Sequence, residues 1–121
     1  MGVRLRFTAT YRSFEEQNKL FNQRPKVTNA KGGQSIHNYG LAFDIVILKQ
    51  DDKGVWRASW DVDVYWMQVA GYFKRKGFVW GGDWKSFKDY PHFELTFGKD
   101  WRYYSQAEKI VDAGIYYPKL Y

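Results

Sequence analysis

The sequence predicts an α+β fold with a small antiparallel sheet and flanking helices. Two segments have the pattern of strands: Leu41 to Leu48 is almost wholly apolar, β-branched and aromatic, and His92 to Phe97 alternates polar and apolar residues. Val62 to Lys76 carries apolar residues at helical spacing and is followed by Gly77, which predicts a helix. The elements follow one another without a regular strand–helix–strand repeat, so a parallel sheet is not expected.

Shorter segments complete the predicted elements. A capping box formed by Ser13 and Glu16 indicates the start of the first helix. The remaining predictions are, in chain order, a helix as far as Gln23, a loop from Arg24 to Gln34, a turn from Asp51 to Gly54, a return strand from Val55 to Ala58, a strand from Phe78 to Trp80 and a final helix from Ser105 to Asp112.

Length and composition exclude several classes of protein. A chain of 121 residues has the size of one domain, so residues 1–121 are expected to fold together. The absence of cysteine excludes disulfides, iron–sulfur clusters, thiolate zinc sites and a cysteine nucleophile. No apolar run approaches the ~20 residues of a membrane span, so membrane insertion is not expected. Because the first residues lack a hydrophobic signal core, we expect synthesis in the cytoplasm without a signal peptide. We also expect a monomer.

The charge balance and the aromatic content are unusual. Lys and Arg exceed Asp and Glu by 19 to 13, a net charge of +6, and aromatic residues make up 21% of the chain. A basic, aromatic-rich domain is suited to bind a polyanion or a sugar polymer. Aromatic side chains in the core and lysines that keep the protein soluble explain the same numbers, and composition alone favours this second interpretation.

One acidic residue, Asp44, interrupts the first apolar strand. A buried carboxylate needs a salt bridge, hydrogen bonds or a metal, and for Asp44 alone a salt bridge to one of the 19 basic residues would suffice. The chain has only two histidines: His37 lies seven residues before Asp44, and His92 begins the second strand. If the strands pair, these three side chains can meet. Two imidazoles and one carboxylate suit a catalytic Zn²⁺ that keeps a fourth position for water.

Asp89 and Arg12 are candidates for the chemistry around such a metal. A zinc hydrolase needs a general base, and Asp89 lies three residues before His92, where a turn at Pro91 could bring its carboxylate beside the metal. Arg12 precedes the first helix and could hold a substrate carboxylate or stabilise an oxyanion. The alternatives are an ordinary turn aspartate and a solvated cation at a helix start.

Ordered motifs in the chain resemble those of the LAS-type (M15) zinc peptidases. SIHNYGLAFD at residues 35–44 matches S-x-H-x-x-G-x-A-x-D, and DYPHFE at residues 89–94 resembles the second motif, an acidic residue two positions before a Pro-His pair. YRS at residues 11–13, followed by EQ at 16–17, resembles a third segment. Residues 28–35 and 80–84 resemble the L-alanyl-D-glutamate endopeptidases of phage endolysins and of bacterial wall-recycling or sporulation enzymes. The resemblance covers about residues 12–98 and leaves residues 99–121 as a tail.

The resemblance implies a small sheet with flanking helices around a single zinc site. The implied roles are His37, Asp44 and His92 as metal ligands, Asp89 as general base and acid, Arg12 near the substrate carbonyl or carboxylate, and Ser35 near the substrate backbone. Two features depart from the family pattern. Some relatives place glutamate at the position of Asp89, and family domains usually start further upstream.

The resemblance implies a zinc-dependent peptidase that hydrolyses peptidoglycan stem peptides, at the L-Ala–D-Glu bond according to the subgroup motifs. A carboxypeptidase that removes terminal D-Ala is the alternative within the family. A non-catalytic binder of nucleic acid or glycan is the alternative from another class, and it leaves the histidine–aspartate pattern unexplained. We therefore expect stem peptides, and not nucleic acid, as the partner. The expected place of action is the bacterial cell wall, in phage lysis or wall turnover.

Overall fold

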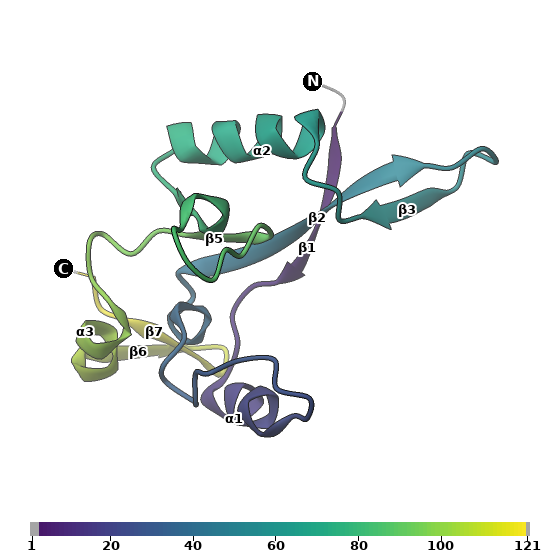
Figure 1. Ribbon diagram of the computed structural model, residues 1–121. Helices are drawn as coiled ribbons and strands as arrows, with labels where there is room; N and C mark the ends of the chain where they lie inside the picture. Colours follow the sequence, from purple (N-terminus) through teal and green to yellow (C-terminus); the bar gives the residue numbers. More distant parts are fainter. Residues whose placement is uncertain (1–2, 121) are drawn as a thin grey trace. The chain divides into compact units, whose positions relative to one another are not determined.

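The computed structural model describes residues 3–120 and divides into two compact units (Figure 1). Residues 3–9 and 43–95 form the first unit, and residues 10–42 and 96–120 form the second. Each unit combines helix with antiparallel strands, as the predicted α+β class requires. Within residues 3–120, none of the helices has the length and apolar character needed to cross a membrane.

The first unit is built on a sheet in the order β1-β2-β5-β4, with β3 also paired to β2. Its strands are β1 (Arg4–Ala9), β2 (Ala42–Gln50), β3 (Trp56–Ser59), β4 (Val79–Trp80) and β5 (His92–Glu94). Strand β5 is shorter than the predicted His92–Phe97, and β1 was not predicted. The β1–β2 register shifts between Phe7 and Ala9, which places Ala9 opposite Asp44. Such irregularities are common next to functional sites.

Helix α2 (Val64–Arg75) contributes its buried apolar face to the core of this unit. Asp63 is its N-cap and accepts from the N–H groups of Tyr65 and Trp66. The core residues, each less than 5% exposed, are Ile45, Ile47, Trp66, Val69, Ala70, Trp80 and Phe93. The predicted helix over 62–76 is therefore confirmed, with its buried face on the sheet that carries Asp44 and His92.

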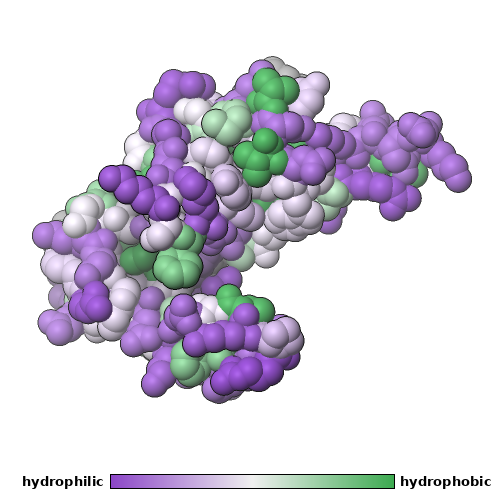
Figure 2. Space-filling model, in the orientation of Figure 1, coloured by the Kyte–Doolittle hydropathy of each residue, from purple (hydrophilic) through white to green (hydrophobic). Residues whose placement is uncertain are grey.

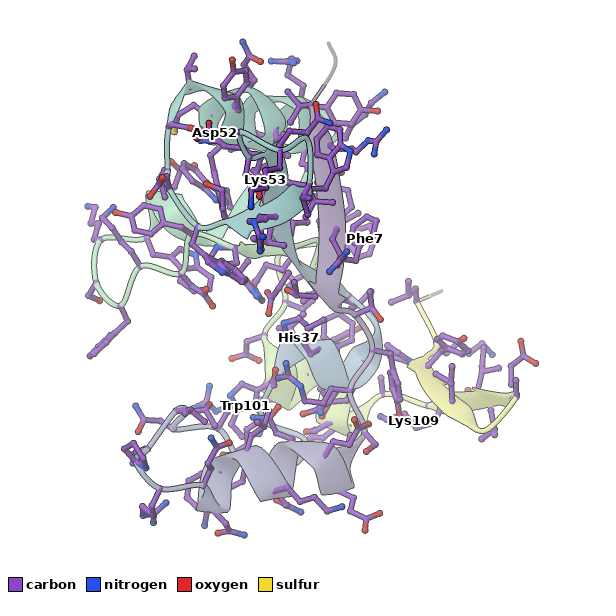
Figure 3. All side chains as sticks on the ribbon, turned by 90° about the vertical axis from the view of Figure 1, so that its right-hand side faces the viewer. Phe7, His37, Asp52, Lys53, Trp101 and Lys109 are labelled. Carbon is purple, nitrogen blue, oxygen red and sulfur yellow. The ribbon has the colours of Figure 1, made fainter. Side chains whose placement is uncertain are left out.

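Strands β2 and β3 continue beyond the core as a hairpin. The turn after β2 is held by Asp51, whose Oδ1 accepts from the N–H groups of Lys53 and Val55. Figure 2 shows that hydrophilic residues cover most of this hairpin, and Figure 3 shows Asp52 and Lys53 at its tip. The predicted turn and return strand are confirmed.

The second unit packs around two buried tyrosines, Tyr39 and Tyr104, each 1% exposed. Their rings lie 6.0 Å apart, and their hydroxyls donate to the carbonyls of Gly33 and Thr96 at 2.6 Å. The elements of this unit are α1 (Phe14–Asn22), the 3₁₀ helix η1 (Ile36–Tyr39), α3 (Trp101–Gln106), β6 (Lys109–Asp112) and β7 (Ile115–Pro118). The capping box predicted at Ser13 is present at the start of α1.

The predicted final helix from Ser105 to Asp112 is wrong. Helix α3 begins earlier, because Asp100 caps it by accepting from the N–H groups of Arg102 and Tyr103. Residues 109–112 instead form β6, which pairs with β7 as an antiparallel hairpin. Ala113 and Gly114 both have positive φ, the conformation that a tight two-residue hairpin turn requires. Pairing with a strand that the sequence did not reveal outweighed the local helical pattern.

Candidate metal centre

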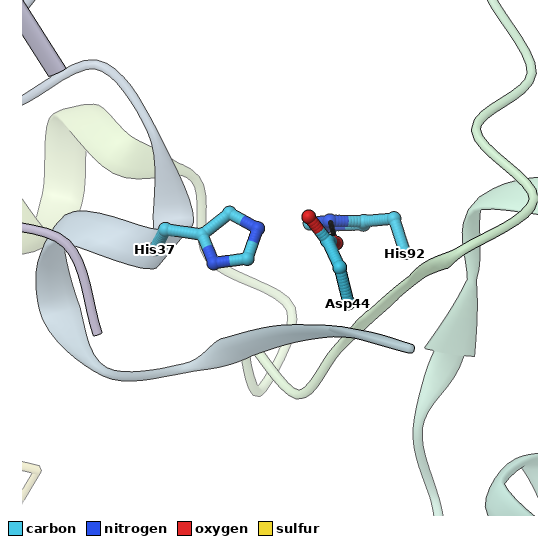
Figure 4. A group of neighbouring side chains, drawn as sticks. All are labelled: His37, Asp44 and His92. Carbon is cyan, nitrogen blue, oxygen red and sulfur yellow. Dashed lines mark hydrogen bonds and ion pairs between the residues drawn. The ribbon is translucent and has the colours of Figure 1, made fainter. Parts of the chain in front are cut away.

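His37, Asp44 and His92 form the candidate metal site of residues 3–120 (Figure 4). One ligand atom of each residue lies within 4.8 Å of the others. His37 and His92 are buried and Asp44 is partly buried. The grouping brings together the three side chains that the sequence singled out as ligands.

His37 is presented by the 3₁₀ helix η1. Ser35 caps this helix, since its hydroxyl accepts from the His37 N–H at 3.3 Å, and Gly40 ends it with φ +72°. The Nδ1 of His37 lies 2.8 Å from the Thr10 carbonyl oxygen, which can only accept a hydrogen bond. Nδ1 therefore carries the proton, and Nε2 carries the lone pair that can ligate a metal. The role of Ser35 toward substrate stays a prediction.

Asp44, His92 and Glu94 form a hydrogen-bonded row in the first unit. His92 Nδ1 lies 3.1 Å from Asp44 Oδ1, and His92 Nε2 lies 2.7 Å from Glu94 Oε1. The register of the sheet produces this row, because β2 and β5 are neighbours and residues 92 and 94 share one face of β5. The side chains of Asp44 and Glu94 are 22% and 19% exposed, and the ring between them is a partner of both carboxylates.

The two carboxylates determine the protonation of His92. Burial disfavours the charged ring, but hydrogen bonds from the ring to Asp44 and Glu94 outweigh burial and raise the pKa of His92 to about 9. Without a metal, the ring is therefore a cation at neutral pH. Metal binding at Nδ1 requires loss of that proton, while Nε2–H continues to donate to Glu94.

The donor set fits zinc. Two imidazole nitrogens and one carboxylate give three protein ligands, the number found in catalytic zinc sites. One ligand atom of each residue lies within 4.8 Å of the others, close enough for the three to share one ion. Glu94 and the Thr10 carbonyl accept from the other ring nitrogens, as outer acceptors do for metal-bound histidines.

The backbone of Asp89 is held beside the start of β5. Its N–H donates to the Gly81 carbonyl and its carbonyl accepts from the His92 N–H, each at 3.1 Å. A Cβ at Gly81 would lie 2.2 Å from the Asp89 carbonyl oxygen, so this close approach requires glycine. Asp89 is exposed. The candidate base is thus tied to a candidate ligand three residues later.

Two buried tryptophans fix the segment between Asp89 and His92. The indole N–H groups of Trp66 and Trp80 both donate to the Tyr90 carbonyl, at 3.1 and 2.7 Å. Trp66 belongs to α2 and Trp80 to β4, and both are buried in the core of the first unit. The segment is therefore attached to the core of the first unit.

Arg12 lies directly before α1 and is held at both its backbone and its side chain. The Arg12 N–H donates to the His37 carbonyl at 3.0 Å, and Nη1 donates to Gln17 Oε1 at 3.0 Å. Gln17 is 2% exposed, and its own Nε2 donates to the Ala30 carbonyl at 2.9 Å. A guanidinium has five N–H donors, so the bond to Gln17 orients the group and leaves donors for a substrate oxygen.

Asn38 joins the start of α1 to the loop before η1. The side chain is fully buried, and its Oδ1 accepts from the N–H groups of Gly33 and Ser35 at 3.0 and 3.2 Å. Its Nδ2 donates to the carbonyls of Arg12 and Ser13 at 2.8 and 3.2 Å. The amide therefore uses its full hydrogen-bonding capacity to fix the backbone around two predicted site residues.

Three of these supporting side chains were not identified as site residues from the sequence: Gln17, Asn38 and Glu94. Glu94 could have been found, because strand alternation places it on the same face as His92. Gln17 stands in the EQ pair of the third resembling segment, but that resemblance implied no role for it. Asn38 gave no signal, since a buried amide is recognised only from the groups that surround it.

Comparisons with known proteins agree with the site. A family model of the M15 peptidases, described as D-alanyl-D-alanine carboxypeptidase, matches residues 28–95. The peptidoglycan L-alanyl-D-glutamate endopeptidase CwlK of Bacillus subtilis (strain 168) is 45% identical over 103 residues, covering 78% of this chain and 62% of that protein. The crystal structure of Serratia marcescens L-Ala D-Glu endopeptidase ChiX matches with a TM-score of 0.58 and 34% identity, over 78% of this chain and 68% of that chain.

The matched stretch includes His37, Asp44, Asp89 and His92 and spans more than half of the chain. The chain spans 62% of the length of its curated relative. Arg12 precedes the stretch that the family model matches. The family match over more than half of the chain shows that this chain belongs to the M15 family of peptidases.

Proposed function

We propose that this protein is a zinc-dependent peptidase that hydrolyses the L-Ala–D-Glu bond of peptidoglycan stem peptides. The group of His37, Asp44 and His92, inside the region that matches the M15 family, carries the proposal. The bond specificity is supported by two relatives, 45% and 34% identical, that are named as L-alanyl-D-glutamate endopeptidases. The bacterial cell wall is then the place of action.

His37, Asp44 and His92 would hold the zinc, which when bound acidifies a water molecule and polarises the scissile carbonyl. His37 offers Nε2, because its Nδ1 is bonded to the Thr10 carbonyl. His92 would offer Nδ1, the nitrogen on the side of Asp44, and keep the bond from Nε2 to Glu94. The bond to the Thr10 carbonyl selects one tautomer of His37 and so reduces the reorganisation that metal binding requires there. His92, which is bonded to a carboxylate at each nitrogen, would have to release its Nδ1 proton.

Asp89 and Arg12 carry the remaining steps. The Asp89 carboxylate accepts a proton from the attacking water and delivers it to the amine nitrogen as the C–N bond breaks. The Arg12 guanidinium donates to the carbonyl oxygen, where negative charge grows in the transition state. Arg12 can do so without a large loss of side-chain freedom, because Gln17 already orients it.

A carboxypeptidase acting on terminal D-Ala is the second candidate, because the description of the family model names that activity. Such an enzyme must bind a free carboxylate, and Arg12 is the side chain of the set that could do so. The two candidates leave different products. An endopeptidase creates a new amino terminus inside the stem peptide, whereas a carboxypeptidase releases free D-Ala.

Digestion of purified peptidoglycan tests the proposal. The zinc-loaded protein is expected to create new D-Glu amino termini, which mass spectrometry of the released peptides identifies. Release of D-Ala without new amino termini would show that the protein is a carboxypeptidase and not an endopeptidase. A non-catalytic binder would instead leave the wall intact, and its metal-free form would bind single-stranded nucleic acid or glycan in a salt-sensitive manner.

Arg12→Lys is expected to lower kcat more than it raises KM. Lysine keeps the positive charge but loses the planar fork of donors, so the charge that grows in the transition state is stabilised less well. Steady-state kinetics on a defined muropeptide measure the effect, which we expect at about 10-fold or more. Arg24→Lys is the matched control, because its guanidinium donates to the carbonyls of Phe21 and Gln23 in an exposed loop. Wild-type values of kcat and KM in Arg12→Lys would show that Arg12 is a solvated cation without a catalytic role.

A further inference from the structure

The loop before Asp89 holds a phenylalanine ring in solvent on a strained backbone. Phe87 is 91% exposed, and its φ is +52°. Bulky residues rarely adopt the left-handed region, because Cβ crowds the following carbonyl. The exposed ring also lacks the stabilisation that a phenylalanine side chain normally gains when it is buried. Both costs are avoidable with a smaller polar residue. Phe97 carries the same costs, at 60% exposure and φ +54°, so Phe87 is distinguished by its greater exposure and by its place in the loop of Asp89.

The loop that presents Phe87 is anchored on both sides. Lys88 Nζ donates to the Gly82 carbonyl at 3.0 Å, and the Asp89 N–H donates to the Gly81 carbonyl at 3.1 Å. Both glycines are buried. The Phe87 ring is thus held out from the core by fixed neighbours.

Phe87 also lies close to the reacting groups. It is two residues before Asp89, so the two Cα atoms are at most about 7 Å apart. Trp84 lies three residues before Phe87, and the centroid of its ring is 5.3 Å from that of the His92 ring. Phe87 therefore belongs to the same loop as the candidate base, and Trp84 of that loop contacts the candidate ligand His92.

The substrate of the proposed reaction carries a sugar at a matching distance. In peptidoglycan the nitrogen of L-Ala is acylated by the lactyl ether of a muramic acid ring. The scissile carbonyl of L-Ala is then about two residue lengths, roughly 7 Å, from that pyranose. A pyranose has an apolar face of C–H groups, which packs on the flat face of an exposed aromatic side chain.

We propose that Phe87 forms a sugar subsite, in which its ring packs against the muramic acid residue that bears the stem peptide under attack. This inference rests on the proposed function. The subsite would make the enzyme prefer peptide still attached to the glycan strand over free peptide. Lys85, exposed on the same loop, adds a positive charge that suits an anionic wall polymer.

Phe87→Asn tests the subsite with two substrates, a muramyl peptide and the same peptide with an acetyl group in place of the muramyl group. The variant is expected to lose roughly 3- to 10-fold in kcat/KM on the muramyl peptide and to match wild type on the acetyl peptide. Its thermal midpoint is expected to equal or exceed that of wild type, because asparagine tolerates positive φ. Isothermal titration of both substrates to the zinc-free proteins measures the same preference without cleavage.

Phe97→Asn is the matched control. Phe97 is also exposed, at 60%, and also has positive φ, at +54°, but it follows β5 outside the loop of Asp89. We expect wild-type values on both substrates. An equal loss on both substrates, or no loss on the muramyl peptide, would overturn the subsite. If the wild type cleaved neither substrate, the proposed function would fail, and the titrations would still decide whether Phe87 binds the sugar.

Discussion

His92→Ala is expected to abolish both tight zinc binding and peptidase activity. The substitution removes one of only two imidazoles in the chain and the ring that separates Asp44 from Glu94. Loss of an outer hydrogen bond to a metal ligand typically costs 10- to 100-fold in affinity or activity, so loss of the ligand itself should exceed about 100-fold. Zinc content after dialysis and the rate of muropeptide cleavage measure the two effects.

Tyr90→Phe is the control for the His92 substitution, because it changes the same segment and keeps an aromatic ring beside Trp80. It should retain zinc and activity. The thermal midpoint of metal-free His92→Ala should also fall, since two carboxylates that are largely shielded from solvent would lose their shared partner. One zinc per chain, bound as tightly as in wild type, would show that the ligand assignment is wrong.

Asp89→Asn is expected to keep zinc and fold but to lose activity by about 10²–10⁴-fold, the usual contribution of a general base. The amide preserves the size of the side chain, and the backbone bonds to Gly81 and His92 do not involve the carboxylate. An amide cannot accept the proton of the attacking water. Zinc analysis, the thermal midpoint and kcat on a defined muropeptide separate chemistry from binding and stability.

Asp83→Asn provides the control for a lost carboxylate in the same part of the chain. Asp83 pairs with Lys74 at 2.6 Å, and an exposed pair of this kind contributes little to stability. Its activity should therefore match wild type. The pH profile adds a further readout, because the acidic limb of kcat/KM that reports the base should disappear in Asp89→Asn. Loss of zinc from Asp89→Asn would instead show that Asp89 is a metal ligand, and the assignment of Asp44 as a ligand would then have to be tested again.

Local sequence patterns determined much of the fold and the list of candidate residues. The capping box at Ser13, the helix over 62–76 and the apolar strand that contains Asp44 depend on contacts within a few residues, so their patterns were readable directly. The three candidate ligands stood out because histidine is rare in this chain and a carboxylate interrupts an apolar strand. The family resemblance then connected these residues to zinc and peptide hydrolysis.

Tertiary structure decided what depends on partners distant in sequence. Strand β1 and the β6–β7 hairpin exist through pairing, and the pairing of residues 109–112 overruled a local helical pattern. The contact of His92 with both Asp44 and Glu94 depends on β5 lying next to β2. Arg12 is held by two buried amides: the Gln17 side chain accepts from its guanidinium, and Asn38, 26 residues away, donates to its carbonyl. Hydrogen bonds of this kind depend on three-dimensional position rather than on spacing, so no pattern along the chain could have indicated them.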